Sequence, residues 1–89
     1  MKKKIVNLTT TEALVLQQIY EDVEDDLPTL SRQLRLSRHY AATVVASLKR
    51  KGLLVVTDHY HQLWIKLSTR GKYMVRYVWP QVQYYMAQA

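Results

Sequence analysis

The strongest constraint on the fold is a change of hydrophobic period at Gly52. Three aliphatic residues before this glycine recur at helical spacing, namely Ala41, Val45 and Leu48. The runs 53–56 and 63–67 that follow it are rich in β-branched, aliphatic and aromatic residues, and the polar stretch 57–62 between them has the length of a hairpin loop. Because glycine is typical just past a helix end, the sequence predicts a helix over 38–51 followed by a β-hairpin.

Two further helices are predicted upstream of this point. Thr9 and Glu12 have the spacing of a capping box, which starts a helix over 10–24. Its apolar face consists of Leu16, Ile19, Tyr20 and Val23. A short helix over 28–34 begins with Pro28, and Ser37 is the expected N-cap of the helix over 38–51. The acidic cluster 21–26 is unfavourable at a helix C-terminus unless Asp25 or Asp26 caps the next helix.

Charge is distributed unevenly along the 89 residues, whose net charge is +6. Residues 5–26 carry six acids and no base, whereas residues 27–89 carry ten lysines and arginines and the single acid Asp58. A basic remainder of this kind suits a polyanionic partner, although a solvated basic surface would have the same composition.

Three stretches resemble bacterial regulators of the multiple-antibiotic-resistance regulator (MarR) family. They are LSRQLRLS at 30–37, VVASLKRKGLL at 44–54 and LSTRGK at 67–72. The resemblance implies an α+β winged helix-turn-helix with a three-helix core, a two-stranded wing and a C-terminal helix. It also implies binding of double-stranded DNA and regulation of transcription. Full members of the family carry dimerisation helices at both ends, and Asp58-His59-Tyr60 stands where they often have Asp-x-Arg.

The resemblance assigns candidate DNA contacts to the outward side chains of the helix-turn-helix. The candidates for reading base edges in the major groove are Arg38, His39, Tyr40, Ala42 and Thr43. The candidates for phosphate contacts are Arg32, Arg35, Ser37, Lys49, Arg50 and Arg70. Lysine at 49 and 51 has an equally good local use at a helix C-terminus, and all these residues would be solvated if there were no DNA target.

The predicted hairpin tip contains His59, Tyr60 and His61, which are candidates for contact with the minor groove or the DNA backbone. Two histidines are too few for a metal site, and no metal or other cofactor is predicted. Cysteine is absent, and there is neither a glycine-rich phosphate loop nor a catalytic constellation, so we expect no enzyme. We also expect no membrane span and no signal peptide, and hence a cytoplasmic protein.

The C-terminal segment is unusually aromatic. Ser68 is the expected N-cap of a helix that continues to about residue 86 and is kinked at Pro80. Candidates for a homodimer interface are Tyr73, Tyr77, Trp79, Tyr84 and Tyr85, because one small domain cannot cover them all. Alternatively, the segment folds back after Pro80. The predicted organisation is thus a mobile tail 1–8, a DNA-binding domain 9–72 and a dimerisation element 73–89; the rival function is a winged helix that binds protein or RNA.

Overall fold

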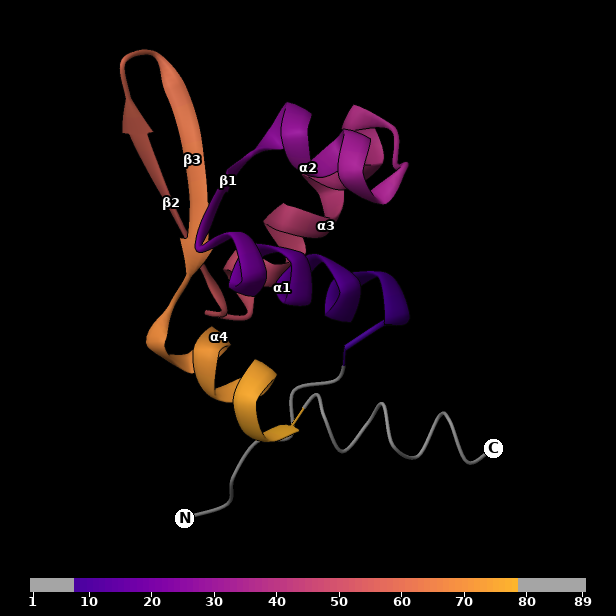
Figure 1. Cartoon of the computed structure of the whole chain (residues 1–89), viewed down its shortest axis with the longest axis vertical. Coiled ribbons are helices and arrows are strands. Elements are labelled where there is room, and N and C mark those ends of the chain that lie inside the picture. Colours follow the sequence, from indigo (N-terminus) through magenta and orange to yellow (C-terminus); the bar gives the residue numbers. More distant parts are fainter. Residues whose placement is uncertain (1–7, 79–89) are drawn as a thin grey trace.

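The computed structural model describes residues 8–78, and their order of elements confirms the predicted α+β winged helix-turn-helix (Figure 1). The elements are α1 (Thr10–Asp22), β1 (Glu24–Asp26), α2 (Leu27–Leu34), α3 (Arg38–Arg50), β2 (Leu54–His59), β3 (Gln62–Leu67), α4 (Thr69–Tyr73) and the π-helical turn η1 (Met74–Val78). The β2–β3 hairpin projects from the helices on the same side of α1 as α2, whereas α4 lies on the opposite side of α1. None of the described helices is long and apolar enough to cross a membrane.

Side-chain caps set the start of each α-helix. The four N-cap residues are Thr9, Asp26, Ser37 and Ser68, and the side chain of each accepts a hydrogen bond from a backbone N–H. The predicted capping box is present, since the Glu12 N–H donates to Thr9 Oγ1 (3.1 Å) and the Thr9 N–H donates to Glu12 Oε1 (2.9 Å). Of the two aspartates considered as caps for α2, Asp26 takes the role, with its Oδ1 2.8 Å from the Thr29 nitrogen.

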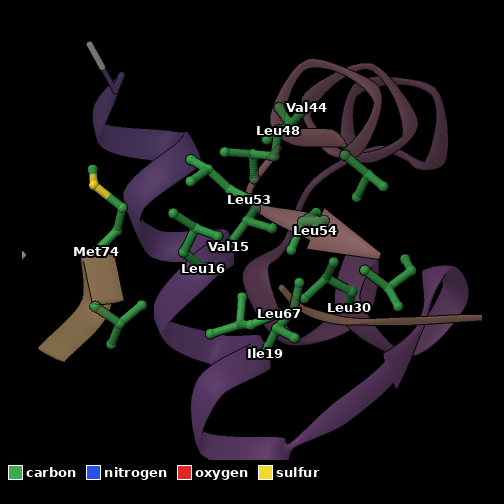
Figure 2. Packing of buried hydrophobic residues seen from close by; sticks show 13 residues of the cluster. Val15, Leu16, Ile19, Leu30, Val44, Leu48, Leu53, Leu54, Leu67 and Met74 are labelled. Atoms are coloured by element: carbon green, nitrogen blue, oxygen red, sulfur yellow. The ribbon is translucent and has the colours of Figure 1, made fainter. Parts of the chain in front are cut away.

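One hydrophobic core joins the three helices to the sheet and to η1 (Figure 2). The predicted stripe on α3 is buried, and Val44 is buried with it. Met74 and Val75 of η1 close the core from the far side of α1, and Leu8, placed at the end of the predicted tail, packs against the same cluster. The core therefore holds one face of α3 and leaves the opposite face of the helix exposed to solvent.

The prediction that the first helix continues to residue 24 is wrong. The helix ends at Asp22, and the next residue, Val23, has a φ of 71° and a 75% exposed side chain, so it is no part of the apolar face. The chain then forms β1, which pairs antiparallel with β3, so the predicted two-stranded wing is the outer part of a three-stranded sheet of order β1-β3-β2. Pairing with β3 satisfies backbone groups of residues 24–26 that further helix would otherwise satisfy.

The two strands of the wing extend further than predicted, and the turn between them is shorter than the predicted loop 57–62. Strand pairing continues out to His59 and Gln62, so that Tyr60 and His61 alone form the turn. Both turn residues have positive φ, 54° and 63°, which is the backbone pattern of a type I′ turn. That turn favours Asn and Gly, which explains why the sequence of this segment predicted a longer loop.

Close backbone packing anchors α4. A Cβ at Gly71 would collide with the backbone oxygen of Leu53, so only glycine lets the start of α4 approach the strand entry this closely. The backbone continues from Tyr73 into η1, where the hydrogen-bonding changes to the π pattern. The predicted continuation of this helix to residue 86, with a kink at Pro80, lies outside the described residues from position 79 on.

Candidate nucleic-acid interface

The first two turns of α3 present every predicted base-reading side chain to solvent. Those side chains are Arg38, His39, Tyr40, Ala42 and Thr43, and all are exposed. The exposure follows from the packing of Ala41, Val44 and Val45 into the core, which turns the opposite face of the helix outward. Arg38 and His39 make no side-chain hydrogen bond or ion pair with any part of the chain between residues 8 and 78, so both remain available to a ligand.

Two of these residues have partners within the fold. The Tyr40 hydroxyl is 3.5 Å from Thr11 Oγ1 on α1, which directs this ring toward the start of α1. Thr43 Oγ1 donates to the His39 carbonyl one turn earlier (3.0 Å), which leaves the oxygen free to accept another hydrogen bond. Ser37 Oγ accepts from the Tyr40 N–H (3.1 Å), so the predicted cap is confirmed and its hydroxyl proton remains for a further acceptor.

The turn between α2 and α3 is held by Ser31 and strained at Arg35. Ser31 is buried, its hydroxyl donates to the Leu36 carbonyl, and its own carbonyl accepts from the Leu36 N–H at 2.9 Å. Arg35 lies in the left-handed region with φ 55° and ψ 43°, a conformation that costs a non-glycine residue about 1 kcal/mol. Its exposed guanidinium has no hydrogen-bond or ion-pair partner among the described residues, so no local polar contact explains the arginine.

A second group of cations gathers at the C-terminal end of α3. Lys49 and Arg50 are exposed there, and Arg70 joins them from the start of α4: its Nη1 lies 3.9 Å from where a Cβ on Gly52 would stand. Arg70 therefore belongs with this end of α3 rather than with its first turns. The remaining phosphate candidate, Arg32, is exposed on α2, where its charge lowers the pKa of Asp26 after the stronger effect of the Thr29 hydrogen bonds.

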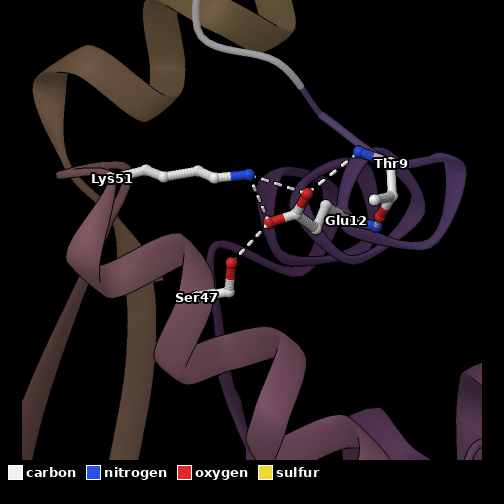
Figure 3. A network of polar contacts seen from close by, with 4 residues as sticks. All are labelled: Thr9, Glu12, Ser47 and Lys51. Carbon is white, nitrogen blue, oxygen red and sulfur yellow. Dashed lines mark hydrogen bonds and ion pairs between the residues drawn. The ribbon is translucent and has the colours of Figure 1, made fainter.

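Lys51 has a structural role instead, in a network that joins α1 to α3 (Figure 3). Its Nζ lies 2.8 and 2.9 Å from the two carboxylate oxygens of Glu12, and Ser47 Oγ donates to Glu12 Oε2 at 2.9 Å. Burial on its own raises the pKa of Glu12. The hydrogen bonds from Lys51, Thr9 and Ser47 outweigh it, so the pKa lies below its ordinary value. The local use predicted for Lys51 is its charge at a helix C-terminus; the ion pair with Glu12 is a different local role that no pattern in the sequence indicates.

The wing tip is fully accessible. His59, Tyr60 and His61 are all exposed, and Tyr60 is 98% exposed although it is aromatic and its backbone is strained. Within residues 8–78 there is no group of three histidine or acidic side chains placed to hold a metal ion. The tip therefore presents one aromatic ring and two imidazoles at the far end of the hairpin.

The predicted dimer interface is only partly visible. Tyr73 at the end of α4 is 52% exposed, as the prediction requires. The Tyr77 side chain, Trp79, Tyr84 and Tyr85 lie outside the described residues. The homodimer therefore stays a prediction.

An exposed second helix of a helix-turn-helix, flanked by cations and a wing, is the architecture of winged-helix nucleic-acid-binding proteins. Several solved structures have a similar fold. The chain is similar to a MarR family protein from Bacillus stearothermophilus (TM-score 0.80, 22% identity, covering 93% of this chain and 59% of that one). It is also similar to BpsR of Bordetella bronchiseptica, whose DNA binding is regulated by 6-hydroxynicotinic acid (0.82, 18%, 91% and 60%).

A third similar structure is a mutant of MarR from E. coli complexed with operator DNA, with a TM-score of 0.74, 18% identity, and coverage of 78% of this chain and 51% of that one. The chain thus has the winged-helix fold of MarR-family transcriptional regulators and spans between half and three fifths of the length of these structures. No protein-family model and no curated protein matches the sequence.

Proposed function

We propose that this protein is a cytoplasmic, sequence-specific regulator of transcription that inserts α3 into the major groove of double-stranded DNA. The observation that carries the proposal is the exposed N-terminal half of α3, where Arg38 and His39 face solvent without partners. In B-DNA, the major groove admits a helix and presents a distinct donor and acceptor pattern for each base pair. The neighbours' fold supports the proposal, since one of them is complexed with operator DNA.

The proposed division of labour follows the position of each side chain. Arg38 is the candidate for a bidentate contact with guanine, and Thr43 and Ala42 contact bases further along the groove. The cations of α2, of the turn, and of the C-terminal end of α3 then contact phosphates and set the register of the protein on the duplex. The proposed role of the wing tip is to contact the minor groove or the adjacent backbone.

Backbone strain at Arg35 supports a functional use of the turn. Glycine at this position would have no Cβ clash in the left-handed conformation, so an arginine there is better explained by what its side chain binds than by folding. Arg35→Gly is therefore expected to raise the free energy of unfolding by about 0.5–1 kcal/mol while weakening DNA binding. A gain of stability together with unchanged DNA affinity would remove Arg35 from the interface.

The test begins with selection of bound sequences from random duplex DNA, followed by fluorescence anisotropy on the selected site. If about six phosphates are contacted, log affinity should fall with log salt at a slope of about −5. Arg38→Ala should cost about 1–3 kcal/mol at one base position and relax the preference there, whereas Arg32→Ala should weaken all sequences alike. Lys66→Ala, which removes an exposed cation from β3, is the control for net charge.

A flat salt response with no selected sequence would contradict the proposal and favour the rival, a winged helix that binds a protein or RNA. The same pattern in Arg38→Ala and Arg32→Ala across a panel of mismatched sites would contradict the assignment of base-reading and phosphate-contacting residues.

We further propose that the protein acts as a homodimer through the segment that begins at Tyr73, since two-fold symmetry doubles the number of base contacts that one small winged-helix domain can make. Trp79→Ala combined with Tyr84→Ala should then yield monomers and weaken binding to a palindromic site more than to a half-site. Light scattering of the wild-type protein at micromolar concentration tests this directly, because a mass near the 10.5 kDa of one chain would rule out the dimer.

A further inference from the structure

A buried aspartate with one unpartnered carboxyl oxygen lies where the wing meets the helix-turn-helix. Asp25, the central residue of β1, is 5% exposed, and its Oδ2 has no hydrogen-bond partner. Its register partner on β3 is Ile65, which pairs in turn with Val56 on β2. Since paired residues of neighbouring strands point to the same face of a sheet, the Asp25 carboxyl lies on the core face beside aliphatic side chains.

The charged groups nearest to this carboxyl are themselves acidic. Burial, followed by the hydrogen bond and charge of Asp22 and the charge of Asp26, raises the pKa of Asp25 to about 7. Asp22 is held at the end of α1 by the Gln18 amide, 3.0 Å away, and this hydrogen bond is the largest cause of the lowered pKa of Asp22.

The remaining charges of the surrounding elements do not compensate Asp25. From α2, Arg32 acts on Asp26. From β1 and β3, Glu24 and Lys66 are register partners of each other, and because side chains alternate along a strand they point to the face opposite Asp25. An ionised Asp25 would therefore be a third negative charge beside Asp22 and Asp26.

The position of Asp25 couples its charge to the wing. Strand β1 lies between α1 and α2 in the chain and pairs with β3, so it is one of the segments that attach the wing to the helix-turn-helix. The attachment also includes a hydrogen bond from Gln62 Nε2, next to the wing turn, to Oδ2 of Asp26 (2.7 Å). Asp26 in turn caps α2. Repulsion among the three aspartates acts on this attachment and not on the β2–β3 hairpin itself.

We propose that Asp25 is a proton-operated latch: with its carboxyl protonated it holds β1 against β3, and loss of that proton to solvent loosens the wing from the helix-turn-helix. In the protonated form the Asp25 hydroxyl donates a hydrogen bond to the Asp22 carboxylate. In the ionised form this bond is lost and a charge is left in an apolar site. If the wing contacts DNA, as the proposed function holds, DNA affinity falls as pH rises from about 6 to about 8.

The latch is tested first without DNA, on the full chain. The ¹³C resonance of the Asp25 carboxyl should titrate with a midpoint near pH 7, and the protection factors of amides in the β1–β3 pairing should fall at least threefold between pH 6 and 8. Amides of the β2–β3 pairing should keep their protection. Asp25→Asn, which mimics the uncharged form, should abolish the pH dependence, whereas Asp58→Asn on the exposed wing should preserve it.

A carboxyl midpoint below pH 5, or equal loss of protection in Asp25→Asn, would overturn the latch. The carboxyl titration of the wild-type protein decides the matter even if Asp25→Asn does not fold. Anisotropy on the selected DNA site then separates the two proposals. Loss of β1–β3 protection with no DNA binding at any pH would leave the latch standing and overturn the proposed function. DNA binding with β1–β3 protection that does not change with pH would overturn the latch and leave the proposed function standing.

Discussion

The two ends of α1 hold buried carboxylates of opposite character. Glu12 in its first turn is 4% exposed, and Asp25, three residues beyond its end, is 5% exposed. The Glu12 carboxylate accepts hydrogen bonds from Thr9, Ser47 and Lys51, whereas one oxygen of Asp25 has no donor. The pKa of Glu12 is consequently lowered and that of Asp25 is raised to about 7. Equal burial thus goes with opposite shifts of the pKa, and the hydrogen-bond donors decide the direction of each shift.

The two carboxylates therefore give the stability opposite pH dependences. The contribution of Glu12 is present above its unfolded pKa of 4.5 and is lost as pH falls through its lower folded value. The contribution of Asp25 is fully present below its unfolded pKa of 3.8 and is lost as pH rises through about 7. We expect the protein to be most stable in mildly acidic solution, where Glu12 is ionised and Asp25 is largely protonated.

The largest effect is expected from Glu12→Gln. This change removes the charge that Lys51 neutralises and leaves a partly buried ammonium without its carboxylate, which should lower the free energy of unfolding by about 2–4 kcal/mol at pH 7. Urea denaturation followed by circular dichroism measures the loss. Glu21→Gln, an exposed position on the same helix, should change stability by less than about 0.5 kcal/mol. Equal losses in the two variants would show that the network in Figure 3 adds no more to the free energy of unfolding than an exposed carboxylate does.

Asp25→Asn should act in the opposite direction and depend on pH. At pH 8 the wild-type protein holds an unfavourable buried charge, so the amide should raise the free energy of unfolding by about 1–3 kcal/mol. At pH 5 the carboxyl is protonated in the folded protein but ionised in the unfolded chain, so the gain should be smaller than at pH 8, and it should disappear only below the unfolded pKa of 3.8. Urea denaturation at both pH values is the measurement. A variant that is less stable than the wild type at pH 8 would contradict the assigned charge state of Asp25.

Removal of the Gln62 amide should have a smaller effect. Gln62→Ala deletes the exposed hydrogen bond to Asp26 and should lower the free energy of unfolding by about 0.5–1 kcal/mol, while protection of the β1–β3 amides falls further than global stability does. Hydrogen exchange distinguishes local loss of β1–β3 protection from loss of global stability. Gln17→Ala, which deletes a comparable exposed hydrogen bond to Glu21 on α1, should leave β1–β3 protection unchanged.

The smallest expected quantity is the coupling between the two ends of α1. A helix of 13 residues is about 20 Å long, so the effects of Glu12→Gln and Asp25→Asn should add to within about 0.5 kcal/mol. The double variant should also have a nearly flat stability profile between pH 4 and 8. A coupling above about 1 kcal/mol in a double-mutant cycle would mean that the two carboxylates belong to one cooperative unit.

Much of the candidate interface follows from local patterns. Ala41, Val45 and Leu48 define the buried side of α3, and the exposure of Arg38 and Thr43 follows from that phase alone. The position of Arg70 could not be predicted in this way. It lies beside Gly52 because Gly71 brings α4 onto the Leu53 backbone, a contact between segments that no periodicity reports.

Local sequence patterns specify the helix starts, the helical phase of α3, and the existence of a hairpin after Gly52. Those features depend on residues within a few positions of one another, such as Thr9 with Glu12 and Ser37 with Tyr40. The acidic segment 24–26 becomes a strand through tertiary contacts, because three acidic residues have little intrinsic preference for a sheet and pair with a strand about 40 residues further along the chain. The tertiary structure likewise decides which of the two buried carboxylates meets a cation, since burial and donors both come from packing across the core.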